Sequence, residues 1–255
     1  MTDDRAWSDY LSAFHRAQPG ITENVLALST AQAESPYAWL ADPLGDLSPV
    51  LDLACGSGAL HRPLGDGRWI GFDLSTAELG QAAHNGAGPL VQADVARLPA
   101  RAGVAGAVVC SMALMIVEPL DAVLAEVARV LTPGGIFVAM VPVEGPLSGR
   151  DRLRYLRLLA ALRVSRLEYP NRLALKDPAA RLAAHGLRLV GDERRRFRFP
   201  LTDGGAAATL VRSLYLPDVA RRRIDAAERI ASRWRGDLGI PLRRFVCRFD
   251  ATMIS

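Results

Sequence analysis

Cysteine and lysine are both scarce in this 255-residue chain, and no long hydrophobic run interrupts it. The three cysteines, Cys55, Cys110 and Cys247, form no C-x-x-C pair, so neither a disulfide framework nor a zinc site is expected. No apolar run approaches the roughly 18 residues of a membrane span. The acidic start MTDDRAWSDY lacks the basic and apolar regions of a secretory signal. These absences predict a cytoplasmic protein with no metal and no membrane partner.

The distribution of charge is uneven along the chain. Residues 1–142 carry 15 acidic and 7 basic residues, whereas residues 143–255 carry 12 acidic and 24 basic residues. An anionic partner would therefore bind the second half. The only lysine is Lys176, and this lopsided use of arginine indicates that arginine fills ordinary surface positions. We expect most of the basic residues to form a solvated face.

Short apolar runs alternate with helical stretches after Pro49. The runs comprise residues 50–54, 69–74, 89–94, 106–113 and 135–141, and an apolar helical stripe spans residues 120–131. This alternation predicts an α/β fold with a mostly parallel sheet and helices on both faces. Two later alternating segments, residues 187–201 and 243–253, predict an antiparallel edge. The edge would complete a seven-strand sheet whose last strand is antiparallel.

We expect a single domain over residues 1–255. Residues 1–47 are predicted to form an N-terminal helical cover, because the aromatic and apolar residues of the segment 7–14 share one helical face. Residues 48–142 would form the ligand-binding core. Helical insertions are predicted after the fifth strand, at residues 143–176 and 202–240. A further helix is expected at residues 177–186, with Asp177 as its N-cap and Gly186 as its stop.

The stretch VLDLACGSGAL, residues 50–60, ends the first predicted strand in a turn of nearly bare backbone. Glycine at positions 56 and 58 lets a ligand approach the backbone closely. With a helix start expected near residue 58, the turn's amides predict an electropositive nest for a carboxylate or phosphate. The dinucleotide fingerprint G-x-G-x-x-G is broken at its sixth position by His61, which disfavours a nicotinamide or flavin cofactor.

Three carboxylates follow one another at intervals of 21 residues, at Asp52, Asp73 and Asp94. Each ends one of three consecutive predicted strands, and ligands bind at the carboxyl ends of strands in open α/β sheets. Asp73 can accept both hydrogen bonds of a ribose diol, and Asp94 can accept one from an exocyclic adenine amine. Each residue alone could be a helix cap, but the three together favour a ligand site.

These segments resemble the class I S-adenosylmethionine-dependent methyltransferases, especially the bacterial small-molecule group. The resemblance covers residues 48–142 and rests on VLDLACGSG (50–58), GFDLS (71–75), QADVARLP (92–99) and VVCSMALMIVEPLDAVLAEVARVLTPGGIFV (108–138). It implies a Rossmann-like sheet and S-adenosyl-L-methionine as cofactor. Where relatives often carry an aromatic residue or histidine after the fourth strand, this chain has Met115 and Ile116.

The resemblance also implies a set of cofactor contacts at the strand ends. Asp73 would bind the ribose, Leu74 would pack on the adenine, and Ser111 with Met112 would flank the sulfonium. The methionine part would be lined by Asp52, Ala54, Gly56 and Gly58, and the adenine edge would be held by Asp94 and Val95.

The implied reaction is methyl transfer to an oxygen or nitrogen atom of a small organic acceptor. An in-line displacement needs mainly alignment, and a general base is required only where the acceptor must lose a proton. His15 is the candidate base, because it ends the aromatic N-terminal helix just before Pro19 and Gly20. Tyr10 and Arg16 on the same helix are expected to close over the methionine end of the cofactor.

Two alternatives stay open. The first is an RNA methyltransferase that uses the basic C-terminal half, and the second is a non-catalytic protein that binds S-adenosylmethionine. CSMAL stands where an N/D-P-P-Y/F motif would be expected, which argues against methylation of exocyclic base amines. Helical and strand spacing would also scatter the arginines of residues 150–157 and 194–198, so nucleic acid is the less favoured partner. The sequence does not define an oligomeric state.

Overall fold

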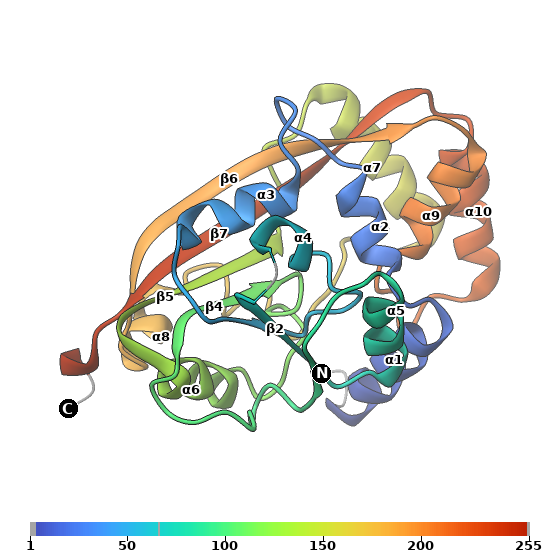
Figure 1. Ribbon diagram of the computed structural model, residues 1–255. Helices are drawn as coiled ribbons and strands as arrows, with labels where there is room; N and C mark the ends of the chain where they lie inside the picture. The colour runs from blue at the N-terminus through green and yellow to red at the C-terminus, as the bar shows by residue number, and fades with distance from the viewer. Residues whose placement is uncertain (1–3, 66, 254–255) are drawn as a thin grey trace.

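The computed structural model describes residues 4–65 and 67–253, which are built on one seven-stranded sheet (Figure 1). The strand order is β3-β2-β1-β4-β5-β7-β6. The parallel strands are β1 (Val50–Leu53), β2 (Trp69–Asp73), β3 (Leu90–Gln92), β4 (Ala105–Ser111) and β5 (Leu131–Pro142). Strand β7 (Gly236–Phe249) runs antiparallel to both β5 and β6 (Leu187–Leu201). The predicted fold class is confirmed, including the antiparallel last strand.

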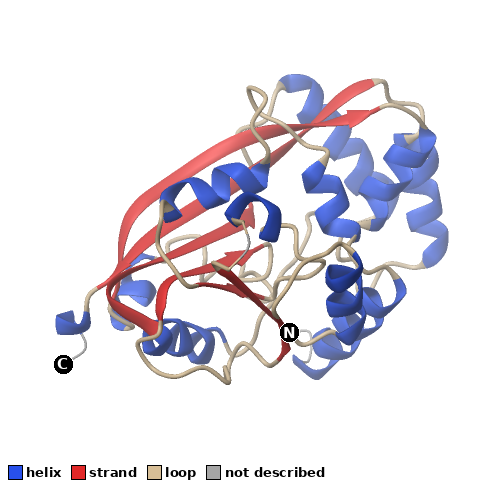
Figure 2. Cartoon of the chain, viewed as in Figure 1, coloured by secondary structure: helices blue, strands red, loops and turns tan. Residues whose placement is uncertain are grey.

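Both faces of the sheet are covered by helices (Figure 2). One apolar core joins the sheet to α6 (Leu120–Val130), whose Val123, Leu124 and Val127 form the predicted stripe. The other core joins the sheet to α3 (Pro36–Ala41), with Trp39 at its centre. Because both faces are covered, β1 is buried along its whole length, which explains why its sequence reads as a continuous apolar run interrupted only by Asp52.

The N-terminal cover consists of separate helices rather than one long helical segment. Helix α1 (Asp4–Ala17) packs against α5 (Thr76–His84), and α2 (Ile21–Ala27) packs against α3 and α9 (Gly204–Arg212). The chain turns between α1 and α2 at Gly20, whose φ of 74° is left-handed and therefore suits glycine. Residues 28–35 contain no helix, and α3 is followed by the short helix η1 (Asp42–Leu44).

The turn after β1 differs from the sequence prediction. A helix was expected to start near residue 58, but α4 spans only His61–Leu64. Gly56 and Gly58 have φ values of 53° and 76°, and this left-handed backbone delays the helix. The electropositive character of the turn therefore comes from its own amides and not from a long helix dipole.

The C-terminal half adds helices at one end of the sheet, where α7 (Gly149–Leu162), α9 and α10 (Arg221–Ala231) gather beside α2 (Figure 1). They share an apolar core with the end of β6 and the start of β7. Helix α8 (Ala179–Ala184) starts after Pro178, so Asp177 is not its N-cap as predicted. The short helix η2 (Ala251–Met253) follows β7. None of the helices in residues 4–65 and 67–253 is long and apolar enough to span a membrane.

Candidate functional site

The carboxyl ends of β1, β2 and β4 meet at one edge of the sheet. The parallel register sets Asp52 beside Gly71 of β2 and Val109 of β4, so the segments that follow these strands converge. They enclose a small cavity of about 20 Å³. Its lining comprises Thr22, Glu23, Tyr37, Asp52, Ala54, Cys55, Ala59, Leu60, Ser111 and Met112. The core thus contributes Asp52, Ala54, Ser111 and Met112, four of the residues expected to contact the cofactor, whereas α2 adds Thr22 and Glu23, which were not predicted.

Two non-glycine residues of the cavity have left-handed backbone. Ala54 has a φ of 52° and Met112 a φ of 56°, and they follow the neighbouring strands β1 and β4. Such conformations cost roughly 1–3 kcal/mol each and cluster at ligand sites. The strain therefore marks this edge of the sheet as a candidate site independently of any motif.

Asp52 is buried with one carboxylate oxygen unsatisfied. Its Oδ2 accepts a hydrogen bond from Trp69 Nε1 at 3.0 Å, but its Oδ1 has no partner among the described residues. Burial raises the pKa of Asp52 to about 8. An unpaired buried oxygen costs free energy, so this oxygen suits a cationic or hydrogen-bond-donating ligand.

Asp73 fastens the glycine loop to β2. Its Oδ2 accepts the Gly56 N–H at 2.9 Å and its Oδ1 accepts the Ser75 N–H at 2.8 Å. Burial raises the pKa of Asp73 even though both backbone bonds act to lower it. The carboxylate predicted to bind a ribose thus accepts two backbone hydrogen bonds, one of which comes from the glycine loop.

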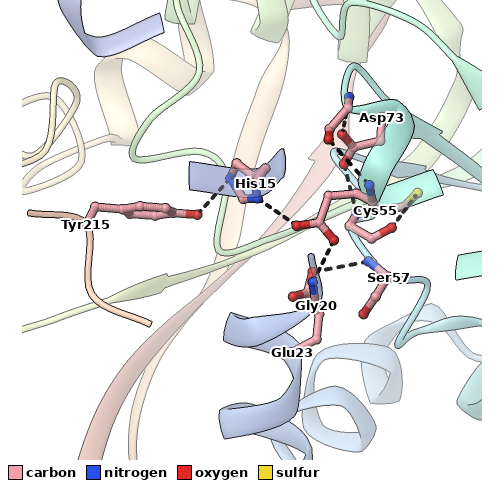
Figure 3. Close-up of polar contacts among 10 residues, drawn as sticks. His15, Gly20, Glu23, Cys55, Ser57, Asp73 and Tyr215 are labelled. Atoms are coloured by element: carbon pink, nitrogen blue, oxygen red, sulfur yellow. Dashed lines mark hydrogen bonds and ion pairs between the residues drawn. The ribbon is translucent and has the colours of Figure 1, made fainter. Parts of the chain in front are cut away.

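Glu23 lies directly over the glycine loop (Figure 3). Its Oε1 accepts the Ser57 N–H at 3.3 Å, and a Cβ atom at Gly56 would stand only 1.7 Å from this oxygen. Burial, together with the nearby charge of Glu78, raises the pKa of Glu23 to about 7. A side chain at position 56 would therefore clash with Glu23, so this arrangement requires glycine there. Gly58 lacks a side chain for a different reason, since a Cβ there would lie 2.7 Å from that of Ala87.

Glu78 on α5 holds the N-terminal helices in place. Its Oε1 lies 2.7 Å from His15 Nδ1, and its Oε2 accepts the Gly20 N–H at 2.9 Å. The other ring nitrogen of His15 lies 3.3 Å from the Tyr215 hydroxyl (Figure 3). Burial acts to lower the pKa of His15, but the hydrogen bond and charge of Glu78 raise it overall. His15 is thus a fixed member of a Tyr215–His15–Glu78 chain.

The remaining predicted contact residues lie away from the cavity. The Tyr10 hydroxyl accepts the Leu216 N–H at 2.7 Å, and the Arg16 side chain is exposed. Leu74 is 62% exposed after β2, where an adenine could pack on it. Asp94 is exposed and its Oδ1 accepts the Ala96 N–H at 2.9 Å, while Val95 is buried.

Glu23 and Glu78 were not identified from the sequence. Ser75 and Glu78 form an S-x-x-E pattern typical of a helix start, and Ser75 Oγ does accept the Glu78 N–H at 3.4 Å. A helix-start pattern of this kind gives no sign of the contact that Glu78 makes with His15. Glu23 has no local signal, because it reaches the loop only through the packing of α2.

Residues 51–139 match the family model described as a methyltransferase domain. This part of the chain, about a third of its length, is therefore similar to methyltransferase domains. The matched residues run from β1 through β5, so they contain the glycine loop, Asp52, Asp73 and the end of β4.

One curated relative resembles part of this chain in sequence, and solved structures resemble it in fold. A malonyl-[acyl-carrier protein] O-methyltransferase from Alcanivorax borkumensis is 36% identical over 111 residues, which cover 40% of this chain and 37% of that protein. The chain thus matches little more than a third of that relative's length. A solved structure from a study of the conversion of a disulfide bond into a thioacetal group in echinomycin biosynthesis has a TM-score of 0.59. It is 17% identical and the match covers 95% of this chain and 92% of that one, so it supports the fold.

Proposed function

We propose that this protein is a methyltransferase that uses S-adenosyl-L-methionine to methylate an oxygen or nitrogen atom of a small organic acceptor. The observation that carries the proposal is the buried, unpartnered Oδ1 of Asp52 beside the glycine loop. The cofactor has an ammonium group and a sulfonium centre. The unpartnered carboxylate oxygen of Asp52 suits either of these cations. The site residues therefore fit the cofactor of the family.

The cofactor supplies the reactive methyl group, and the protein supplies binding and alignment. Asp52 would accept a hydrogen bond from the ammonium group, and Asp73 would exchange its bonds to the loop for ribose hydroxyls. Ser111 and Met112 would flank the methyl group, and Leu74 would cover the adenine. Asp94 and Val95 would hold the adenine edge, with Ala54, Gly56 and Gly58 lining the methionine part. Alignment of this kind is worth up to about 7–11 kcal/mol in ideal cases.

Where the acceptor must lose a proton, His15 is the proposed general base. Glu78 holds Nδ1 and would stabilise the imidazolium, and Nε2, which lies 3.3 Å from the Tyr215 hydroxyl, would take the proton once the acceptor displaces that hydroxyl. Tyr10 and Arg16 are proposed to approach the cofactor when the N-terminal helices rearrange around it.

A small acceptor is favoured over RNA by the way the arginines are used. Arg150 and Arg154 donate to the backbone carbonyls of the segment 235–237, while Arg195 pairs with Glu34 and Arg196 pairs with Asp151. These four arginines bind groups of the fold itself, which makes them less available to a nucleic-acid backbone. The name of the Alcanivorax relative supports oxygen as the accepting atom.

Calorimetry tests the cofactor assignment. The wild-type protein is expected to bind S-adenosylhomocysteine, and Asp73→Ala is expected to weaken binding about 10- to 100-fold, because a ribose diol loses its charged acceptor. Asp9→Ala, on the exposed part of α1, is the matched control and should leave affinity unchanged. Equal affinity in Asp73→Ala, or tighter binding of NADH, would contradict the assignment.

Methyl transfer itself is tested with tritiated S-adenosylmethionine, given total RNA in one arm and a small-metabolite extract in the other. We expect label in the metabolite arm. Label in RNA would overturn the small-acceptor proposal, and label in neither arm would favour a non-catalytic binding protein.

A further inference from the structure

The cavity at the strand ends is too small for the cofactor that the family uses. Its 20 Å³ holds about one water molecule, whereas ligand pockets measure roughly 300–1,000 Å³. Glu23 occupies part of the space beside the glycine loop, because its Oε1 lies 1.7 Å from where a Gly56 Cβ atom would stand. Any ligand that approaches the loop backbone must first displace this carboxylate.

Glu23 also satisfies the loop in the way an anionic ligand group would. Its Oε1 accepts the Ser57 N–H, while Asp73 accepts the neighbouring Gly56 N–H (Figure 3). Two successive amides of the predicted nest are thus occupied by side-chain carboxylates. A ligand carboxylate or hydroxyl would compete for the same amides.

The contact is easily reversed on electrostatic grounds. Glu23, Asp52, Asp73 and Glu78 lie close enough for mutual repulsion, and among the groups that act on Glu23 only His15 brings a positive charge. The raised pKa of Glu23 agrees with a carboxylate held in an unfavourable field. This repulsion lowers the free-energy cost of moving Glu23 to solvent, so a ligand oxygen that takes over the loop amides can replace it.

Gly20 connects α2, which carries Glu23, to the preceding helix. Gly20 precedes α2 with a left-handed φ and no side-chain cap, so the helix is attached through a glycine. Glu78 fixes both the Gly20 N–H and His15, which anchors this glycine and the end of α1 to α5. The N-terminal end of α2, which carries Glu23, is thus joined through a glycine, while Val25 and Leu26 hold the rest of the helix in the core.

We infer that Glu23 is an internal occupant of the cofactor site, whose carboxylate holds the glycine loop and is displaced when the cofactor binds. The identity of the displacing ligand rests on the proposed function, whereas the contact of Glu23 with the loop does not. The role makes Glu23 a determinant of cofactor affinity that lies outside the residues matched by the family model.

Titration of S-adenosylhomocysteine into three variants tests this inference. Glu23→Ala removes both the charge and the volume and is expected to bind about tenfold more tightly than wild type, since a charge-assisted contact no longer competes. Glu23→Gln keeps the volume and should tighten binding by a smaller factor. Asn24→Ala, an exposed position on the same helix, is the control and should match wild type. Unchanged or weaker binding by Glu23→Ala would overturn the inference, because Glu23 would then be neutral or a cofactor contact.

Hydrogen exchange without ligand separates this inference from the proposed function. Glu23→Ala should speed amide exchange in residues 21–27 and 54–58 relative to wild type, whereas Asn24→Ala should not. Unchanged exchange would overturn the inference. Faster exchange in a protein that binds no S-adenosylhomocysteine, in wild type or variant, would support the contact and contradict the proposed cofactor.

Discussion

Two buried aspartates in this protein have opposite surroundings. Asp151, in the first turn of α7, accepts four hydrogen bonds: from Arg196 Nε at 2.6 Å, the Gly239 N–H at 2.9 Å, the Ser148 N–H at 3.1 Å and the Ser148 hydroxyl at 2.7 Å. Burial alone would raise the pKa of Asp151, but these donors hold it well below its usual range. Asp52 accepts one hydrogen bond, and burial raises its pKa to about 8.

The comparison distinguishes Asp151, a carboxylate that stabilises the fold, from Asp52, a carboxylate that we propose binds a ligand. Each is 1% exposed, so burial does not distinguish them. The number of hydrogen-bond donors distinguishes them. A carboxylate with many donors stabilises the contact between elements, whereas a carboxylate with an unpartnered oxygen gains stabilising free energy when a ligand binds to it. Asp151 joins α7 to the β6–β7 hairpin, and Asp52 faces the cavity beside the glycine loop.

The largest expected effect comes from breaking the satisfied group. Asp151→Ala should lower the free energy of unfolding by about 3–5 kcal/mol, because the buried Gly239 N–H and the Arg196 guanidinium lose their acceptor. Urea denaturation measures the change. Asp225→Ala is the control, since its ion pair with Arg221 on α10 is exposed and should contribute less than about 0.5 kcal/mol. A loss of stability no larger than that of the control would show that Asp151 does not stabilise the fold through its buried hydrogen bonds.

The sequence predicted the two aspartates unequally, for a physical reason. Asp52 interrupts an apolar strand just before a glycine turn, and this local pattern singled it out. Asp73 was singled out because it ends the next apolar run, and the succession of such runs predicted the strands of the core. Asp151 belongs to a helix start, and its partners lie 45 and 88 residues away along the chain. Such contacts depend on the placement of the β6–β7 hairpin, for which the sequence carries no local signal.

The N-terminal cover shows the same limit. Its aromatic face was recognisable from helical spacing, and Phe14 does pack against Tyr215. The position of each side chain over the core was not recognisable, because the packing of α1 on α5 and of α2 on α9 fixes it. For this reason Glu23 and Glu78 escaped prediction. Tyr10 was expected at the cofactor, yet its hydroxyl accepts the Leu216 N–H.

Substituting Asp52 should affect binding more than folding. Asp52→Asn keeps an oxygen for Trp69 Nε1 and replaces the unpartnered carboxylate oxygen, so the free energy of unfolding near pH 7 should not decrease, because a neutral amide does not carry the cost of ionising a buried carboxylate. Affinity for S-adenosylhomocysteine should fall about tenfold or more, because the ammonium group loses a charged acceptor. Calorimetry and urea denaturation on the same sample give both values. A variant that loses stability but keeps affinity would show that Asp52 is structural, like Asp151.

Measured per pH unit, the smallest expected effect is a pH dependence of stability that has opposite signs at the two aspartates. The pKa of Asp52 is raised to about 8 in the folded protein, against about 4 in the unfolded chain, so between these values the folded state binds the extra proton. Stability should therefore fall as pH rises from 4 to 8, by at most about 1.4 kcal/mol per pH unit from this group.

Asp151 has the reverse sign, because its pKa is lowered in the folded protein. Its contribution is fully present above the unfolded pKa of about 4 and is lost as pH falls below that value. Urea denaturation of wild type, Asp52→Asn and Asp151→Asn from pH 3 to 8 resolves the two terms. Asp52→Asn should flatten the slope between pH 4 and 8 and leave the acid limb intact, whereas Asp151→Asn should reduce the acid limb alone. If both variants changed the same limb, the two carboxylates would not differ in their protonation, and donor number would not distinguish a binding aspartate from a structural one.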